Sequence, residues 1–185
     1  MNQKRVLGIL AAVLAGFLQI GAATAGPGQP VPAGATYEVG FSGDNTAQAL
    51  ILRAINSARE NIVMAAYTFT SKDVTLALQA AQKRGVPVYL VVDADEAKKA
   101  YSSAQFLANN GVQVRTNDNF AIMHHKFMVI DRRHVQTGSY NYSKAAASKN
   151  AENVLVLWDV PDLATAYGQE WMKLWGHGQP VKSNY

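Results

Sequence analysis

Two apolar segments limit what this chain can fold into more than any other feature of the sequence. Residues 61–67 (NIVMAAY) and 86–95 (VPVYLVVDAD) carry apolar side chains at most positions, without polar alternation. Strands of this kind are covered on both faces, as in α/β proteins. The segment between them, residues 72–85, is typical of a helix, because Ser71 suits its N-cap and Lys83-Arg84-Gly85 suit its C-terminus. We therefore expect an α/β domain.

Strand-like and helical segments alternate over most of the chain. We expect strands at residues 37–41, 61–67, 86–95, 112–116, 122–130, 134–139 and 153–159, and helices at residues 45–60, 72–85, 97–109 and 161–175. Strands joined by a helix pair in parallel, whereas the short turn Asp131-Arg132-Arg133 predicts an antiparallel pair. The predicted fold is α/β, with a mixed, mostly parallel central β-sheet flanked by helices on both faces.

The first 25 residues have the three parts of a secretory signal peptide. Lys4 and Arg5 form a basic start, residues 6–18 are apolar, and Ala23-Thr24-Ala25 is a small-residue cleavage site. A transmembrane anchor is the alternative, but the run thins into Gly, Gln and Thr, and no stop-transfer charges follow it. We predict cleavage before Gly26, export to the periplasm or the medium, and no stable membrane insertion afterwards.

The rest of the chain is long enough for one domain with its own core. Residues 26–36 are rich in Gly and Pro and predict a flexible leader, residues 37–176 form the domain, and residues 177–185 are a C-terminal tail. The chain contains no cysteine, which excludes a disulfide framework and a thiolate nucleophile and is compatible with export.

The charge of the mature chain is modest in total and concentrated locally. Loss of Lys4 and Arg5 lowers the formal net charge from +4 to +2, which by itself implies no polyanionic partner. Between residues 121 and 150, however, five cations accompany a single acid, Asp131. This excess marks either a surface that faces a polyphosphate or a solvated charged face.

The segment MHHKFMVID (123–131) places titratable groups at the start of a predicted strand. Because side chains alternate along a strand, His124 and Lys126 share one face, and His125 takes the other. The same rule pairs Ser139 with Asn141 at the end of the next strand. An imidazole and an ammonium beside a hydroxyl and an amide form a cradle for an oxyanion.

This region resembles the signature of the phospholipase D superfamily. The pattern H-x-K-x4-D, followed by G-S-x-N, is formed by His124, Lys126, Asp131, Gly138, Ser139 and Asn141. Glu152 falls where members of the family place a carboxylate. The GSYN spacing, shorter than the G-S-x-x-N of many members, is similar to that of the small exported bacterial nucleases that carry one motif and need no metal.

The resemblance implies a role for each of these residues. His124 is the nucleophile, Lys126 and Asn141 hold phosphoryl oxygens with help from Ser139, and Glu152 accepts the other imidazole N–H. Asp131 and Gly138 are structural.

One imidazole cannot begin the reaction both neutral, as nucleophile, and protonated, as acid. Because the chain has a single H-x-K motif, at His124 and Lys126, the second imidazole has to come from a second chain. We therefore expect a two-fold homodimer with one composite site on its axis.

The remaining histidines fit this scheme less well. His125 disagrees with the alternation of the motif, and His134 and His177 have no partner pattern and are expected at the surface. A zinc site built from histidines of this region and Asp131 lacks the familiar ligand spacings. The prediction is no metal and no cofactor.

The aromatic residues leave one alternative open. Trp158, Trp171 and Trp175 have spacings typical of packing in the core. Tyr140 and Tyr142 flank the site asparagine, and they either pack in the protein or stack on a base.

The predicted function is a metal-independent, sequence-nonspecific endonuclease acting on DNA, with RNA as a further substrate. A phospholipase D or phosphatidyl transferase acting on phospholipid head groups is the alternative. A nucleic-acid-binding module without catalysis is the third, but the intact set of His124, Lys126, Asn141 and Glu152 argues against it.

Overall fold

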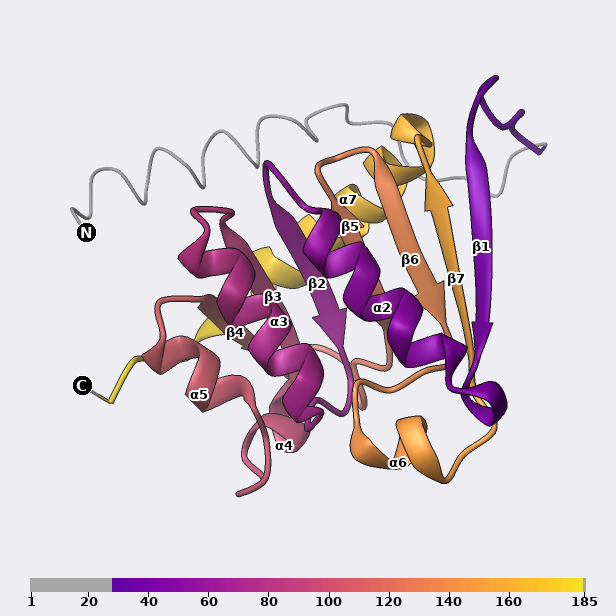
Figure 1. Cartoon of the computed structure of the whole chain (residues 1–185). Helices are drawn as coiled ribbons and strands as arrows, with labels where there is room; N and C mark the ends of the chain where they lie inside the picture. The colour runs from indigo at the N-terminus through magenta and orange to yellow at the C-terminus, as the bar shows by residue number, and fades with distance from the viewer. Residues whose placement is uncertain (1–27, 185) are drawn as a thin grey trace.

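The computed structural model describes residues 28–184, and a single eight-stranded sheet forms their centre (Figure 1). Its strands are β1 (Thr36–Phe41), β2 (Ile62–Ala66), β3 (Val88–Asp93), β4 (Gln113–Asn117), β5 (Lys126–Ile130), β6 (His134–Gly138), β7 (Asn153–Trp158) and β8 (Gln179–Pro180). The helices are η1 (Ser42–Asp44), α2 (Thr46–Ser57), α3 (Lys72–Lys83), α4 (Ala94–Ala97), α5 (Ala104–Asn109), α6 (Lys144–Ser148) and α7 (Pro161–His177).

The sequence predicts a signal peptide at the N-terminus of the chain and a tail at its C-terminus. The predicted signal peptide, residues 1–25, lies outside the described residues. The segment predicted as a C-terminal tail contains β8, which pairs antiparallel with β4 at one edge of the sheet. Among residues 28–184, no helix has the length and apolar character needed to cross a membrane.

The strands follow the order β1-β7-β6-β5-β2-β3-β4-β8. Only β2–β3 and β3–β4 are parallel pairs, and every other pair in the sheet is antiparallel. The mixed sheet with helices on both faces is confirmed, but its predicted mostly parallel character is wrong. The helix α3 and the pair α4 and α5 join β2, β3 and β4 as parallel neighbours. By contrast, α2 connects β1 to β2 and α7 connects β7 to β8, which are not neighbours in the sheet, so these connections create no parallel pair.

Two predicted elements are shorter than expected. The predicted strand at 122–130 begins only at Lys126, because Lys126 pairs with Ala66, the last residue of β2, so residues 122–125 extend past the end of that partner strand. The helix predicted at 97–109 forms only at its end, as α5, and a separate short helix, α4, ends at Ala97. Asp93 caps α4 early, by accepting hydrogen bonds from the N–H groups of Asp95 and Glu96.

Side chains of β2 alternate between two apolar cores, as its uninterrupted apolar sequence predicts. Ile62 and Met64 pack with α2, α3 and α5, whereas Val63 and Ala65 pack with α7. In Figure 1, α2 and α3 lie in front of the sheet and α7 lies behind it.

The three tryptophans predicted to pack in the core lie on β7 and α7. Trp171 and Trp175 are buried against Tyr89, as predicted. Trp158 is half-buried, and its Nε1 donates to Glu38 Oε1 at 2.8 Å.

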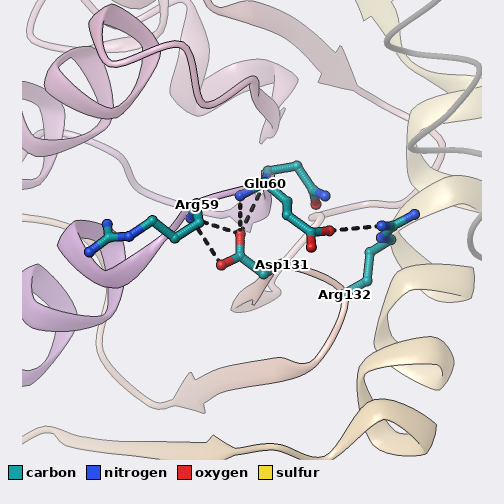
Figure 2. A network of polar contacts seen from close by, with 5 residues as sticks. Arg59, Glu60, Asp131 and Arg132 are labelled. Atoms are coloured by element: carbon teal, nitrogen blue, oxygen red, sulfur yellow. Dashed lines mark hydrogen bonds and ion pairs between the residues drawn. The ribbon is translucent and has the colours of Figure 1, made fainter.

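Asp131 joins two connections at one end of the sheet (Figure 2). It follows β5 with a φ of 53°, and its carboxylate accepts hydrogen bonds from the backbone N–H groups of Arg59, Glu60 and Asn61. Arg132, next in the chain, forms an ion pair with Glu60 at 2.8 Å. Asp131 therefore anchors the loop between α2 and β2, at the end of β5 opposite to Lys126.

Replacement of Asp131 by Ala should lower the free energy of unfolding by about 1–3 kcal/mol, because three backbone N–H groups lose a charged acceptor. Urea unfolding measures the change. Asp118→Ala, which removes an exposed loop carboxylate, is the matched control and should change stability by less than about 0.5 kcal/mol. Equal stability of the two variants would contradict this role of Asp131.

Candidate active site

A pocket of about 740 Å³ opens where β5 begins and β6 ends. It gathers residues from the two sequence blocks of the motif, from the residue before β7 and from α7. The residues that line it are His124, His125, Lys126, Phe127, Thr137, Gly138, Ser139, Asn141, Glu152, Ala166, Tyr167 and Glu170. The predicted nucleophile and all its predicted partners therefore meet here, while Asp131 lies at the far end of β5.

His124 and Lys126 contact each other, as the alternation of a strand predicts. Lys126 Nζ lies 3.1 Å from His124 Nδ1 and donates to the backbone oxygen of His124 at 2.8 Å. The ring of Tyr67 lies against the imidazole, with 4.6 Å between ring centroids, and Lys126 Nζ lies 5.4 Å from the Tyr67 centroid. Tyr67 closes the apolar strand segment, and nothing in its sequence context distinguishes it from a core residue.

Burial and neighbouring charge favour a neutral imidazole at this position. Burial, followed by the charges of Lys126 and His125, lowers the pKa of His124, and the carboxylate of Asp93 opposes this shift. Burial also lowers the pKa of Lys126, and Glu152 opposes that shift. A neutral imidazole has the lone pair that a nucleophile needs.

The second wall of the pocket is held by Ser139 and Glu152. Ser139 Oγ donates to Glu152 Oε2 at 2.5 Å and accepts from the backbone N–H of Asn153 at 3.1 Å. Asn150 Nδ2 donates to the other carboxylate oxygen at 2.9 Å. Ser139 and Asn150 therefore orient the carboxylate of Glu152. Glu152 and His124 line the same pocket.

Gly138 allows β6 and β7 to approach closely beside this wall. Its φ is +151°, and a Cβ there would lie 2.2 Å from the carbonyl oxygen of Asn153. Only glycine has neither the steric conflict nor the conformational penalty. The close approach places Ser139 against the start of β7.

Asn141 has unused hydrogen-bonding capacity beside the pocket. Its Oδ1 is buried, and no donor within residues 28–184 reaches it. Buried side-chain polar atoms are rarely left unpaired, and exceptions occur at functional sites. The unpaired oxygen is an acceptor, so a hydrogen bond from Asn141 to a phosphoryl oxygen has to come from Nδ2.

His125 faces the side of α7. Its Nε2 lies 3.7 Å from Glu170 Oε1, and its ring meets Phe127 edge-on at 5.5 Å. It lines the same pocket, but its contacts are separate from those of Lys126.

The two tyrosines beside Asn141 pack in the protein, which decides the alternative that the sequence leaves open. Both are fully buried, and their hydroxyls donate to Gln48 at 3.3 Å and to Gln136 at 2.6 Å. Burial raises the pKa of Tyr140 to about 12. Neither ring is available to stack on a base.

The other two histidines, His134 and His177, lie away from the pocket. His177 is exposed, as predicted, whereas His134 is half-buried and its Nδ1 accepts the Asp159 N–H at 2.9 Å. The surface prediction for His134 is therefore wrong, because β7 ends beside it. Within residues 28–184, no group of three histidine or acidic side chains is arranged to hold a metal ion.

The fold and the pocket place the protein in the class of α/β phosphodiesterases. The chain belongs to the phospholipase D superfamily: residues 51–175 match the family described as "Cardiolipin synthase, PLD-like domain". This membership is what the motif around His124 and Lys126 predicts.

The known proteins that are similar to this chain include the following three. A phospholipase D of Rickettsia bellii is 39% identical over 118 residues, which cover 64% of this chain and 58% of the relative. The mitochondrial cardiolipin hydrolase of Mus musculus is 31% identical over 135 residues, covering 73% of this chain and 61% of the relative. The chain thus spans about three-fifths of the length of these relatives.

The third is a solved structure, that of the phospholipase D family member Nuc from Salmonella typhimurium. It is 40% identical, with a TM-score of 0.79, and the match covers 80% of this chain and 99% of Nuc. The mixed sheet and its flanking helices are therefore the fold of this family.

Replacement of Gly138 by Ala should destabilise the protein by about 1–3 kcal/mol, because the added methyl group forces β6 away from β7. Thermal and urea unfolding measure the effect. Gly176→Ala is the control: an added methyl group there meets no described atom within 4 Å, and its helical position predicts a gain of about 0.5–1 kcal/mol. Similar stability of the two variants would contradict the close approach at Gly138.

Replacement of Lys126 by Gln should raise the pKa of His124, because the change removes a cation that disfavours the imidazolium. Proton NMR titration of the His124 ring measures the shift. Lys83→Gln, at the exposed end of α3, is the control and should leave that pKa unchanged. A His124 pKa that stays the same or falls in Lys126→Gln would show that Lys126 does not set it.

Proposed function

We propose that the protein is a metal-independent phosphodiesterase that cuts DNA internally and without sequence preference, with RNA as a further substrate. The observation that carries this proposal is the pocket that brings His124, Lys126, Ser139, Asn141 and Glu152 together. Its groups supply a nucleophile, a cation and neutral donors for one phosphoryl group. The similarity to Nuc over nearly the whole length of that protein supports it further.

The reaction proceeds in two displacements. A neutral His124 imidazole attacks phosphorus, so that a P–N bond forms as the P–O bond to the leaving group breaks. A second, protonated imidazole gives its proton to the leaving oxygen. That imidazole, now neutral, takes a proton from water, whose oxygen attacks phosphorus and releases His124. Lys126 and Asn141 hold the non-bridging oxygens, and Glu152 fixes the tautomer of the imidazole.

The second imidazole comes from His124 of a second copy of this chain, in a two-fold homodimer. An exposed apolar stripe on β1 supports such a dimer: Tyr37, Val39 and Phe41 are 71%, 47% and 52% exposed. Gly40 packs against α2, so the stripe lies on the other face of the sheet, the face that α7 covers elsewhere. Phe41 is the strand partner of Asn153, whose N–H donates a hydrogen bond to Ser139 in the pocket. The stripe therefore ends beside the pocket.

Charge near the pocket supports a polyphosphate substrate. Lys144 and Lys149 are exposed at the two ends of α6, in the loop that carries Asn141 and Glu152. Arg132 and Arg133 lie at the opposite end of the sheet in ion pairs with acids, so only part of the predicted basic segment faces the site. Cations beside the reacting phosphate bind the neighbouring phosphates of a nucleic-acid backbone.

Hydrolysis of phospholipid head groups is the second candidate function. The phospholipase D and the cardiolipin hydrolase among the relatives favour it, because the same pocket chemistry serves any phosphodiester. The short G-S-x-N spacing at Ser139 and Asn141 favours the nucleic acid.

We propose in addition that the protein is exported to the periplasm or the medium. The signal-like pattern of residues 1–25 supports this location. A mature chain beginning at Gly26, read from the intact mass of the exported protein, is the expected result, and a retained N-terminus would contradict it.

The decisive test compares plasmid nicking with hydrolysis of cardiolipin vesicles, both in EDTA. The native protein should nick DNA in EDTA, and His124→Ala should lower the rate by at least about 1,000-fold, because the nucleophile is lost. His177→Ala, an exposed histidine away from the pocket, is the control and should keep the native rate. Cleavage of lipid alone would favour the second candidate, and near-normal nicking by His124→Ala would refute the assigned nucleophile.

A further inference from the structure

Asp93 is a buried carboxylate outside the phospholipase D motif. It is the last residue of β3 and is only 5% exposed. Its Oδ1 accepts hydrogen bonds from the N–H groups of Asp95 and Glu96 at the start of α4, both at 3.0 Å. Its Oδ2 accepts from the N–H of Met123 at 2.9 Å. One carboxylate thus joins a helix start to the residue immediately before His124.

The segment that carries His124 has little other regular structure around it. β5 begins at Lys126, which pairs with the last residue of β2, so His124 lies beyond the strand that would otherwise fix it. The side chain of Met123 is 1% exposed, in the core that includes α7. The bond to Asp93 and the burial of Met123 therefore hold the backbone on which the imidazole depends.

The charge of Asp93 also reaches the imidazole. It favours the protonated form of His124, whereas burial, Lys126 and His125 favour the neutral form. Tyr67 also lies against the imidazole, with its ring tilted by 54° and 4.6 Å between ring centroids. Asp93 thus acts on His124 in the opposite sense to its cationic neighbours.

We propose that Asp93 is a positioning residue for the reaction, which fixes the His124 imidazole in the pocket through its hydrogen bond to Met123 N–H. The inference rests on the proposed role of His124 as nucleophile. Asp93 lies behind the segment and does not line the pocket, so it acts on the rate through His124 and not through contact with substrate. Small displacements of a reacting group cost about 100-fold in rate.

The variant Asp93→Asn distinguishes the contact of Asp93 with α4 from its contact with Met123, because it replaces one carboxylate oxygen by an NH2 group. The retained Oδ1 still accepts from α4, whereas the new NH2 group cannot accept from Met123 N–H. Asp95→Asn is the matched control, because it removes an exposed carboxylate from the same helix start without a contact to Met123. Both variants lose one negative charge.

We expect kcat for plasmid nicking by Asp93→Asn to fall between about 10-fold and 100-fold, with KM within about twofold of the native value. Two NMR measurements accompany it: hydrogen exchange of the Met123 amide should become faster, and the pKa of His124 should fall because its acidic neighbour is gone. Asp95→Asn should keep the native kcat, KM and His124 titration.

Native values of kcat and of the His124 titration in folded Asp93→Asn would overturn the proposal. A loss of activity that matches the loss of folded protein, with native kcat per folded molecule, would overturn it as well. If the native enzyme cleaves neither DNA nor lipid, the proposed function fails by itself. The NMR measurements then decide separately whether Asp93 holds the His124 segment.

Discussion

The antiparallel pairing of β2 with β5 is the interaction on which the rest of the structure depends. It joins the parallel half of the sheet, β2-β3-β4, to the antiparallel half, β5-β6-β7-β1. Its last pair, Ala66 with Lys126, ends β2 and begins β5, two residues after His124. The imidazole therefore lies just beyond the sheet, beside Tyr67, where a pocket has room to form.

The pocket holds groups that a stable core would avoid. Lys126 is only 8% exposed, and burial of an ammonium disfavours its charged form. Asn141 keeps a buried amide oxygen without a partner among the described residues. Such features cost stability and are typical of functional sites. Two other residues of the motif have structural roles. Asp131 anchors the loop between α2 and β2, and Gly138 allows the close approach of β6 and β7.

The proposed dimer and the proposed role of Asp93 address the same physical problem, which is how a surface imidazole reaches one defined position. In the dimer, the exposed stripe of Tyr37, Val39 and Phe41 gives a second copy an apolar surface beside the pocket. Within one chain, Asp93 holds the backbone that precedes His124. Reaction in line at phosphorus requires both imidazoles to be oriented on opposite sides of one group.

Local patterns in the sequence determined the buried strands, the shared face of His124 and Lys126, and the set of residues that meet in the pocket, because strand alternation and motif spacing act over a few residues. Local patterns did not determine the mostly antiparallel sheet, the shortening of the helix at 97–109 to α5, or the places of Tyr67 and Asp93 beside the His124 segment. Those features depend on which distant strands pair. Met123 lies 30 residues from Asp93 in the chain, and only the tertiary structure brings them together.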